Sequence, residues 1–319
     1  MAIRATVLIP THDHGPMLCY AARSALAQTM SNIEVFIVGD GASDATREAA
    51  ARLVAEDPRV RFFDNPKGPN RGEGHRHAAL QHAQGEIVCY LPDDDLWLPD
   101  HIETVHSLLQ QADFAHTLPI WVGPNGSVGT WNVDLAAPFF RQMLQSGANR
   151  VPFGCGAHTL AMYRQLPGWR TAAPGLLRDL TDLSMWQQFL AHPACRIVGS
   201  VRPTAVTFPN PQRRDWSLEE RVEELARWTR RLADPSGREG FLMEVLASEA
   251  HEGALLEVHA GALQDRSSVL SEELLRLREE LEAIRGLPSW RVRQWVLRWP
   301  LAARLNLWVG RVLAGPADR

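Results

Sequence analysis

Three consecutive aspartates, Asp93 to Asp95, follow an apolar stretch in "EIVCYLPDDDLWLPDH" (residues 86–101). Adjacent carboxylates repel one another, so a site that holds them together favours a bound divalent cation. Mg²⁺ and Mn²⁺ take oxygen ligands, and Mg²⁺ in particular uses one or two carboxylates, several waters and substrate phosphates. The alternative is a solvated turn in which Asp95 begins the next helix. We expect a site for Mn²⁺ or Mg²⁺ and a phosphate-bearing substrate.

The segments before the aspartates alternate between short apolar runs and helical spacing. Strands are predicted at "ATVLIP", "IEVFIVG", "VRFFDN" and "EIVCYL", with helical patterns between them. This alternation predicts an α/β fold with a mixed, mostly parallel sheet and helices on both faces. Ligands bind such sheets at the carboxyl ends of the strands. The polar residues that follow the first two strands, Thr11, Asp13 and Asp40, are therefore expected near the aspartates.

The rest of the chain divides into segments of different composition. Residues 112–215 are irregular and complete a predicted domain over 1–215. Residues 216–285 contain little proline and much Glu, Leu, Ala and Arg, which predicts a helical extension. Residues 286–319 are rich in Trp and Arg, as in amphipathic segments at a membrane interface. We predict peripheral membrane contact through 289–313, with packing of the tryptophans on the protein as the alternative.

The end of the helical extension has apolar residues at the 4-3-4-3 spacing of a coiled-coil seam, namely Leu270, Leu274, Leu277, Leu281 and Ile284. The seam covers only about two heptads, which is short for an independent coiled coil. Homo-oligomerisation through 240–285 and packing on the main domain therefore both stay open.

Composition restricts the classes of function. The 319 residues have a net charge of −4, which does not favour a nucleic-acid binder. No stretch approaches the roughly 18 apolar residues of a spanning helix. The four cysteines form no CxxC pair, which fits a reducing cytosol. We expect a cytoplasmic protein, or one held at the inner face of the cell membrane by its last segment.

Four segments in order resemble glycosyltransferase family 2, the inverting enzymes of the GT-A fold. They are "TVLIPTHDHGPMLCYAARSALAQT", "IEVFIVGDGASDAT", "GHRHAALQHAQGEIVCYLPDDDLWLPDHIE" and "RDLTDLSMWQQFL". The resemblance extends over roughly residues 1–210. It implies a nucleotide-diphosphate sugar as donor and a hydroxyl of a glycan or lipid-linked precursor as acceptor.

The resemblance also implies residues that bind the nucleotide sugar. "IPTHD" lies where the family holds the nucleoside, which points to Pro10, Thr11 and Asp13. "VGDGASD" retains Asp40 for the base, but Gly39 replaces another acid of the family pattern.

"HRHAAL" keeps the family's arginine as Arg76, which would face phosphate or form a surface salt bridge; His77 stands where asparagine is usual. In "LPDDDLW", the resemblance implies that Asp95 binds the metal and that Asp93 or Asp94 holds the ribose.

An inverting transfer also needs a base within hydrogen-bond reach of the acceptor hydroxyl. The resemblance points to Asp182 in "RDLTDLSMW"; the alternative is an acid at a helix N-terminus, favoured by the dipole. Asp179 has the stronger pattern of an N-cap. We also name Asp179, His158 and Trp169 as candidates for an acceptor or sugar pocket, although a lone histidine is more often structural.

Two other functions stay open. A nucleotidyltransferase acting on sugar phosphates would use a glycine-rich basic loop after the first strand, and "IPTHDHGPML" contains no Lys or Arg. A catalytically degenerate GT-A scaffold is the other, because Gly39, His77 and Pro92 depart from the family pattern.

Overall fold

The computed structural model describes residues 2–169 and 181–286. The chain divides into two compact units, Met1–Ala250 and His251–Arg319. The first unit continues past the boundary between 215 and 216 that the composition suggested. Asp179 and the predicted membrane segment 289–313 lie outside the described residues.

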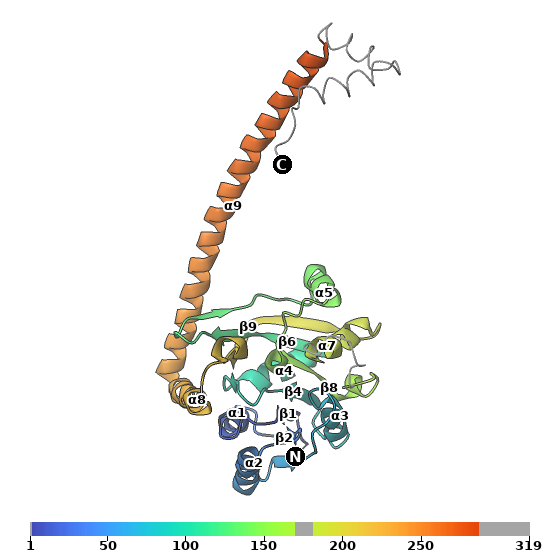
Figure 1. The fold of residues 1–319 in the computed structure, drawn as a ribbon. Coiled ribbons are helices and arrows are strands. Elements are labelled where there is room, and N and C mark those ends of the chain that lie inside the picture. The colour runs from blue at the N-terminus through green and yellow to red at the C-terminus, as the bar shows by residue number, and fades with distance from the viewer. Residues whose placement is uncertain (1, 170–180, 287–319) are drawn as a thin grey trace, which may run out of the picture. The chain divides into compact units, whose positions relative to one another are not determined.

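One sheet forms the centre of the first unit (Figure 1). Its strands are β1 (Ala5–Thr11), β2 (Ile33–Gly39), β3 (Val60–Phe63), β4 (Ile87–Tyr90), β5 (Leu96–Trp97), β6 (Phe114–Val122), β7 (Val128–Thr130), β8 (Gly156–Thr159) and β9 (Ile197–Thr207). The strand order is β3-β2-β1-β4-β8-β6-β9-β5, and β7 pairs with β6. Strands β1 to β4, β6 and β9 run in one direction, and β5, β7 and β8 in the other. The predicted mixed, mostly parallel sheet is confirmed.

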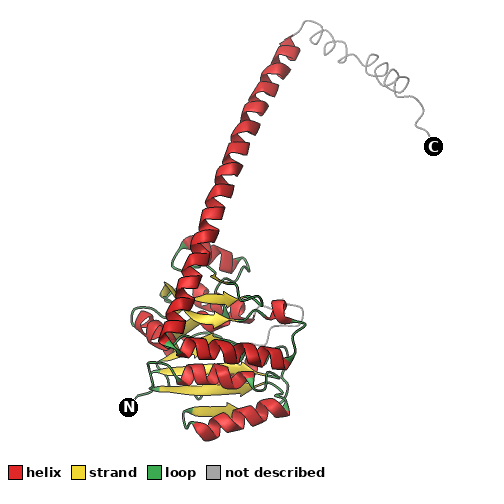
Figure 2. Ribbon diagram, turned by 90° about the vertical axis from the view of Figure 1, so that its left-hand side faces the viewer, coloured by secondary structure: helices red, strands yellow, loops and turns green. Residues whose placement is uncertain are grey.

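The described helices are α1 (Met17–Leu26), α2 (Asp44–Glu56), α3 (Glu73–Leu80), α4 (His101–Leu109), α5 (Pro138–Gln145), α6 (Leu160–Tyr163), α7 (Thr181–Ala191), α8 (Leu218–Ala233) and α9 (Pro235–Gly286). Short 3₁₀ helices lie at η1 (Phe153–Cys155) and η2 (Asn210–Arg213). Figure 1 shows α1 and α2 on one side of the central strands and α3 on the other. In Figure 2, helices lie in front of the strands. Helices thus cover both faces of the sheet, as predicted.

The central strands are apolar because both of their faces are covered. Every residue of β2 and β4 is buried, and β1 is buried except at Pro10. Such strands have no polar face, which explains why the sequence shows continuous apolar runs instead of alternation. The polar residues Thr6 and Glu34 within β1 and β2 are buried and hydrogen-bonded to each other, so the polar side chains that can face a ligand are those at the strand ends.

Helix α8 is an integral part of the first unit. A capping box between Ser217 and Glu220 fixes its start. Its residues Leu225, Trp228 and Leu232 belong to a buried apolar cluster that also contains residues of α1 and β5. The helix is therefore held against the sheet domain by apolar burial.

Helix α9 begins in the first unit and continues through residue 286 of the second. Within residues 251–286 the described side chains are exposed, including several leucines. Among the helices that the structure describes, none is long and apolar enough to cross a membrane.

Candidate active site

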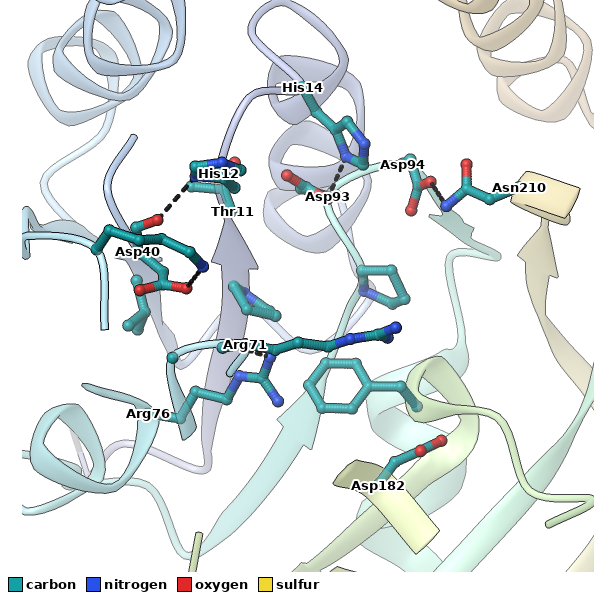
Figure 3. Close-up of a pocket in the computed structure, with 16 residues that line it drawn as sticks. Thr11, His12, His14, Asp40, Arg71, Arg76, Asp93, Asp94, Asp182 and Asn210 are labelled. Atoms are coloured by element: carbon teal, nitrogen blue, oxygen red, sulfur yellow. Dashed lines mark hydrogen bonds and ion pairs between the residues drawn. The ribbon is translucent and has the colours of Figure 1, made fainter. Parts of the chain in front are cut away.

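A cavity of about 390 Å³ lies at the carboxyl ends of β1, β2 and β4 (Figure 3). It brings together seven of the residues singled out from the sequence, which are Pro10, Thr11, Asp40, Arg76, Asp93, Asp94 and Asp182. Asp13, Asp95, His158 and Trp169 are not among the residues that line it. The lining also contains residues that the sequence analysis did not name, among them His14, Lys67, Arg71 and Asn210.

The loop after β4 places two of its aspartates beside a histidine. His14 Nδ1 lies 2.7 Å from Asp93 Oδ1, and potential ligand atoms of His14, Asp93 and Asp94 all lie within 4.8 Å of one another. Burial by itself lowers the pKa of His14, but the hydrogen bond to Asp93 and the charges of both aspartates outweigh it and raise the pKa to about 9. The two aspartates therefore keep His14 in its protonated form at neutral pH.

Asp94 is held from its other side by the C-terminal part of the domain. Its Oδ2 accepts hydrogen bonds from Asn210 Nδ2 at 2.9 Å and from Arg221 Nη2 at 2.8 Å. Asn210 comes from η2 and Arg221 from α8, so both partners are far from Asp94 in the sequence. Burial, followed by the charge of Asp93, raises the pKa of Asp94.

Asp95 fastens the loop to the sheet. Its Oδ1 accepts a hydrogen bond from the backbone N–H of Phe208 at 3.0 Å, just beyond β9. Burial and then the charge of Asp94 raise the pKa of Asp95 well above its usual range. The predicted metal ligand Asp95 thus has a structural contact, whereas Asp93 and Asp94 face the cavity.

Asp40 follows β2, lines the cavity and lies against Gly68 and Gly72. Asp40 pairs with Lys67, and its Oδ1 accepts from the backbone N–H of Gly68 at 2.6 Å. Gly72 has a φ of 73°, and a Cβ there would lie 2.7 Å from Cγ of Asp40. A side chain at Gly72 would be both strained and in the way. The loop between β3 and α3 is therefore shaped around this carboxylate.

Arg76 is a buried cation with few polar partners. Its Nη2 donates to the carbonyl of Arg71 at 2.8 Å, but its Nε has no partner among the described residues. The guanidinium lies over the rings of Phe153 and Trp169, at 5.5 and 5.0 Å. Burial lowers its pKa, against the opposing charges of nearby acids. The Nε–H group of Arg76 is thus available to donate a hydrogen bond to a ligand in the cavity.

Asp182 lies across the cavity from Asp93 and Asp94 (Figure 3). It is in the first turn of α7, and its Oδ2 accepts from Asn149 Nδ2 at 2.9 Å. Trp186, one turn further, is fully buried and donates from Nε1 to the carbonyl of Val151 at 3.0 Å, which anchors the helix. Burial raises the pKa of Asp182, while backbone hydrogen bonds and the charge of Arg76 oppose this.

Of the three candidates for the sugar or acceptor pocket, the two that the structure describes, His158 and Trp169, lie in the core. His158 Nε2 is 2.7 Å from Tyr90 Oη, and Trp169 Nε1 donates to the same hydroxyl at 3.1 Å. Burial lowers the pKa of His158 to about 3, so the ring is neutral at pH 7. Trp169 does not line the cavity, but its ring packs against the guanidinium of Arg76, which does.

Comparison with known proteins shows to which protein family this site and fold belong. A family model described as "Glycosyl transferase family 2" matches residues 6–166, which is half of the chain. The chain belongs to this family. Together with the mixed sheet, family membership defines the fold as the predicted GT-A type.

Individual relatives match a shorter part of this chain than the family model does. The GalNAc(5)-diNAcBac-PP-undecaprenol beta-1,3-glucosyltransferase of Campylobacter jejuni is 31% identical over 118 residues, covering 35% of this chain and 36% of the relative. The chondroitin synthase of Pasteurella multocida is 31% identical over 126 residues, covering 39% and 13%. The matched part is thus about a third or less of the length of these relatives.

Solved structures with a similar fold include TarS of S. aureus in complex with UDP-GlcNAc, with 14% identity, a TM-score of 0.48, and coverage of 65% of this chain and 58% of that one. The mannosyltransferase PcManGT of Pyrobaculum calidifontis, in complex with GDP-Man and Mn²⁺, has 17% identity, a TM-score of 0.46, and coverage of 97% and 88%.

Proposed function

We propose that this protein is an inverting glycosyltransferase that moves a sugar from a nucleotide-diphosphate sugar to an acceptor hydroxyl, with assistance from Mn²⁺ or Mg²⁺. The observation that supports this most is the division of the cavity. An acidic corner with two carboxylates that could hold a cation lies on one side, and a half-buried carboxylate with a raised pKa, Asp182, lies on the other. Family membership favours the same reaction.

The donor would be bound by the strand ends. Thr11 Oγ1 is buried and has no hydrogen-bond partner among the described residues, so a ligand group could satisfy it. Asp40 offers a fixed carboxylate to the nucleoside. Arg76 and Lys67 provide positive charge for the diphosphate, and the unpartnered Nε of Arg76 is a hydrogen-bond donor for it.

The residues of the acidic corner fit a divalent cation. Asp93 Oδ2 is buried without a hydrogen-bond partner among the described residues, a costly state that a cation would relieve. Asp93 and Asp94 would hold the ion, with His14 beside them. When bound, the ion neutralises the charge that develops on the leaving diphosphate. This proposal moves the principal ligand from Asp95 to its neighbours, because Asp93 and Asp94 line the cavity and Asp95 does not.

Asp182 would act as the general base. Its carboxylate would accept the proton of the acceptor hydroxyl while the hydroxyl oxygen forms the new bond to the anomeric carbon and the bond to the diphosphate breaks. Burial raises its pKa, which brings its basicity closer to working pH. Asn149 donates to Oδ2 of Asp182 and so helps to orient the carboxylate.

The test is turnover of a panel of nucleotide-diphosphate sugars with Mn²⁺ and Mg²⁺, followed by NMR of the anomeric configuration of the product. Release of nucleoside diphosphate with inversion supports the proposal. Release of pyrophosphate from a nucleoside triphosphate would favour a nucleotidyltransferase. A protein that binds no nucleotide with either metal would instead be a degenerate scaffold.

The acceptor is proposed to be a glycan or a lipid-linked precursor, by analogy with the family. Membrane contact through 289–313 rests on the Trp and Arg content of that segment alone. Co-sedimentation of the chain with anionic vesicles, compared with a chain lacking residues 287–319, tests this contact; equal binding by both would remove it.

A further inference from the structure

Helix α9 has leucines at every seventh residue along its exposed length. Leu256, Leu263, Leu270 and Leu277 are exposed to 68, 68, 52 and 54%. A spacing of seven places these side chains along one line of a helix. Leu274 is 62% exposed and lies beside this line, because it precedes Leu277 by three residues, slightly less than one helical turn. An apolar line of this length on a helix requires a partner surface.

The heptad positions reveal large and small residues in alternation. If Leu256, Leu263, Leu270 and Leu277 occupy position d, position a holds Gly253, Ala260, Ser267 and Leu274. In a parallel, in-register pair, each residue faces its own copy, so the small residues would face one another and leave gaps. In an antiparallel pair, position a faces position d of the other helix. Large residues then fill the space opposite small ones.

This alternation favours an antiparallel pair, and the register is selected by the charges beside the line, because a shift of one heptad would set Arg266 or Glu273 against its own copy. Placing Ser267 against Leu270 of the second copy also places Ala260 against Leu277 and Leu263 against Leu274. Each of these layers contains at least one leucine. The contact is the same for both copies, so it closes as a symmetric dimer and does not extend into a filament.

Charges beside the line favour the same orientation. In the antiparallel register, Arg266 lies against Glu273 of the other copy, and Glu257 against Arg278, and symmetry repeats each pair. A parallel pair would retain attraction between Glu273 and Arg278 but would bring Glu252 against Glu257, which repel. We propose that residues 256–277 of α9 associate with a second copy of this chain as an antiparallel coiled coil. This goes beyond the proposed catalytic function and does not depend on it.

The oligomeric state of the full chain tests the association. Sedimentation analysis should show a concentration-dependent dimer of twice the 35.6 kDa chain mass. The variant Leu263→Lys with Leu270→Lys should raise the dimer dissociation constant at least tenfold. The matched control, Leu255→Lys with Leu275→Lys, changes two exposed leucines that lie off the line and should leave it unchanged. Circular dichroism checks that both variants stay helical. A chain that stays monomeric, or equal effects of both variants, would overturn the proposal.

Cross-linking tests the orientation. Mixing the Ala260→Cys and Leu277→Cys chains under mild oxidation should give a disulfide-linked dimer of the two variants. Ala260→Cys alone should give none, because 17 residues of helix, roughly 25 Å, separate it from its own copy. The parent chain is the control, since Cys19, Cys89 and Cys155 are buried and Cys195 is half-buried. Self-linking of Ala260→Cys would indicate a parallel pair and contradict the antiparallel register.

Discussion

Asp182 and Arg76 illustrate what single residues contribute at this site. Arg76 is buried and Asp182 is half-buried beside the cavity, yet neither is neutralised by a short ion pair to the other among the hydrogen bonds and ion pairs that the described residues make. A buried charge without a direct partner is costly to the fold. Such costs persist where a ligand or a reaction uses the group.

We predict that Asp182→Asn keeps the fold and donor binding but lowers kcat. The amide preserves the shape and the contact to Asn149 while it removes the proton acceptor. A general base contributes about 10²- to 10⁴-fold to rate, and the loss should fall in this range. Steady-state kinetics with a saturating donor measures it; full transfer by the variant would remove Asp182 from the base role.

The pH dependence follows from the same carboxylate. A base acts in its ionised form, so kcat/KM should rise with pH through the folded-state pKa of Asp182 and then level off. Because burial raises this pKa, the rise should occur at a higher pH than for an ordinary aspartate. The acidic limb should disappear in Asp182→Asn. A pH profile that the substitution does not alter would show that another group controls the limb.

For Arg76→Gln we expect opposite effects on binding and on stability. The substitution removes a donor for the diphosphate, so nucleoside diphosphate affinity should fall at least about tenfold, or roughly 1.4 kcal/mol. It also removes a buried charge that has no carboxylate partner among the described residues, so Tm should stay equal or rise. Calorimetry and thermal unfolding measure the two quantities. Lower stability with unchanged affinity would mean that Arg76 is purely structural.

At the scale of elements, helix α8 contributes to a site that the first four strands define. Arg221 of α8 and Asn210 of η2 both bond to Oδ2 of Asp94, which would leave Oδ1 for the proposed cation. Outer partners of this kind orient a metal-binding carboxylate. The family model ends at residue 166, so these two contacts come from outside it.

Replacing Arg221 tests whether it orients the Asp94 carboxylate or affects metal binding only through its positive charge. Removing a positive charge near a cation should tighten metal binding if only electrostatics matters. If Arg221 orients Asp94, Arg221→Gln should instead weaken Mn²⁺ binding by about 10- to 100-fold. Electron paramagnetic resonance of free Mn²⁺ measures this directly. Arg227→Gln, an exposed change on the same helix, controls for net charge; tighter binding in Arg221→Gln alone would contradict the orienting role.

The sequence predicts some elements of this fold better than others, for physical reasons. β1, β2 and β4 are recognisable because burial of both faces leaves mostly apolar residues. The ends of those strands then locate Asp40 and Asp93. By contrast, Asp94 and Asp95 are adjacent and chemically identical. Only the turn of the backbone decides that one faces the cavity and the other Phe208.

His14, Lys67 and Arg221 show a second limit of sequence reasoning. Each belongs to a loop or an exposed helical pattern, so no periodicity distinguishes it from an ordinary surface residue. Their roles arise from contacts across 79, 27 and 127 residues of chain. For Lys67, its place shortly after the end of β3 was a usable signal, because strand ends of a parallel sheet converge at one edge.

At the scale of the whole molecule, a catalytic unit is joined to a helical unit that we propose to dimerise. The two proposals are independent, because the leucines of α9 lie between 256 and 277 and the residues lining the cavity lie between 10 and 210. Variants of the apolar line of α9 should therefore change oligomeric state without changing nucleotide affinity. The central claim concerns the cavity alone.

The most direct test of that claim is calorimetric titration of the protein with UDP and GDP, with and without Mn²⁺. The account predicts that at least one of these nucleotides binds, that chelation of the metal weakens its binding at least about tenfold, and that Asp94→Asn has the same effect with metal present. Equal affinity in the metal-free protein, or unchanged binding in Asp94→Asn, would contradict a metal-assisted donor site at Asp93 and Asp94.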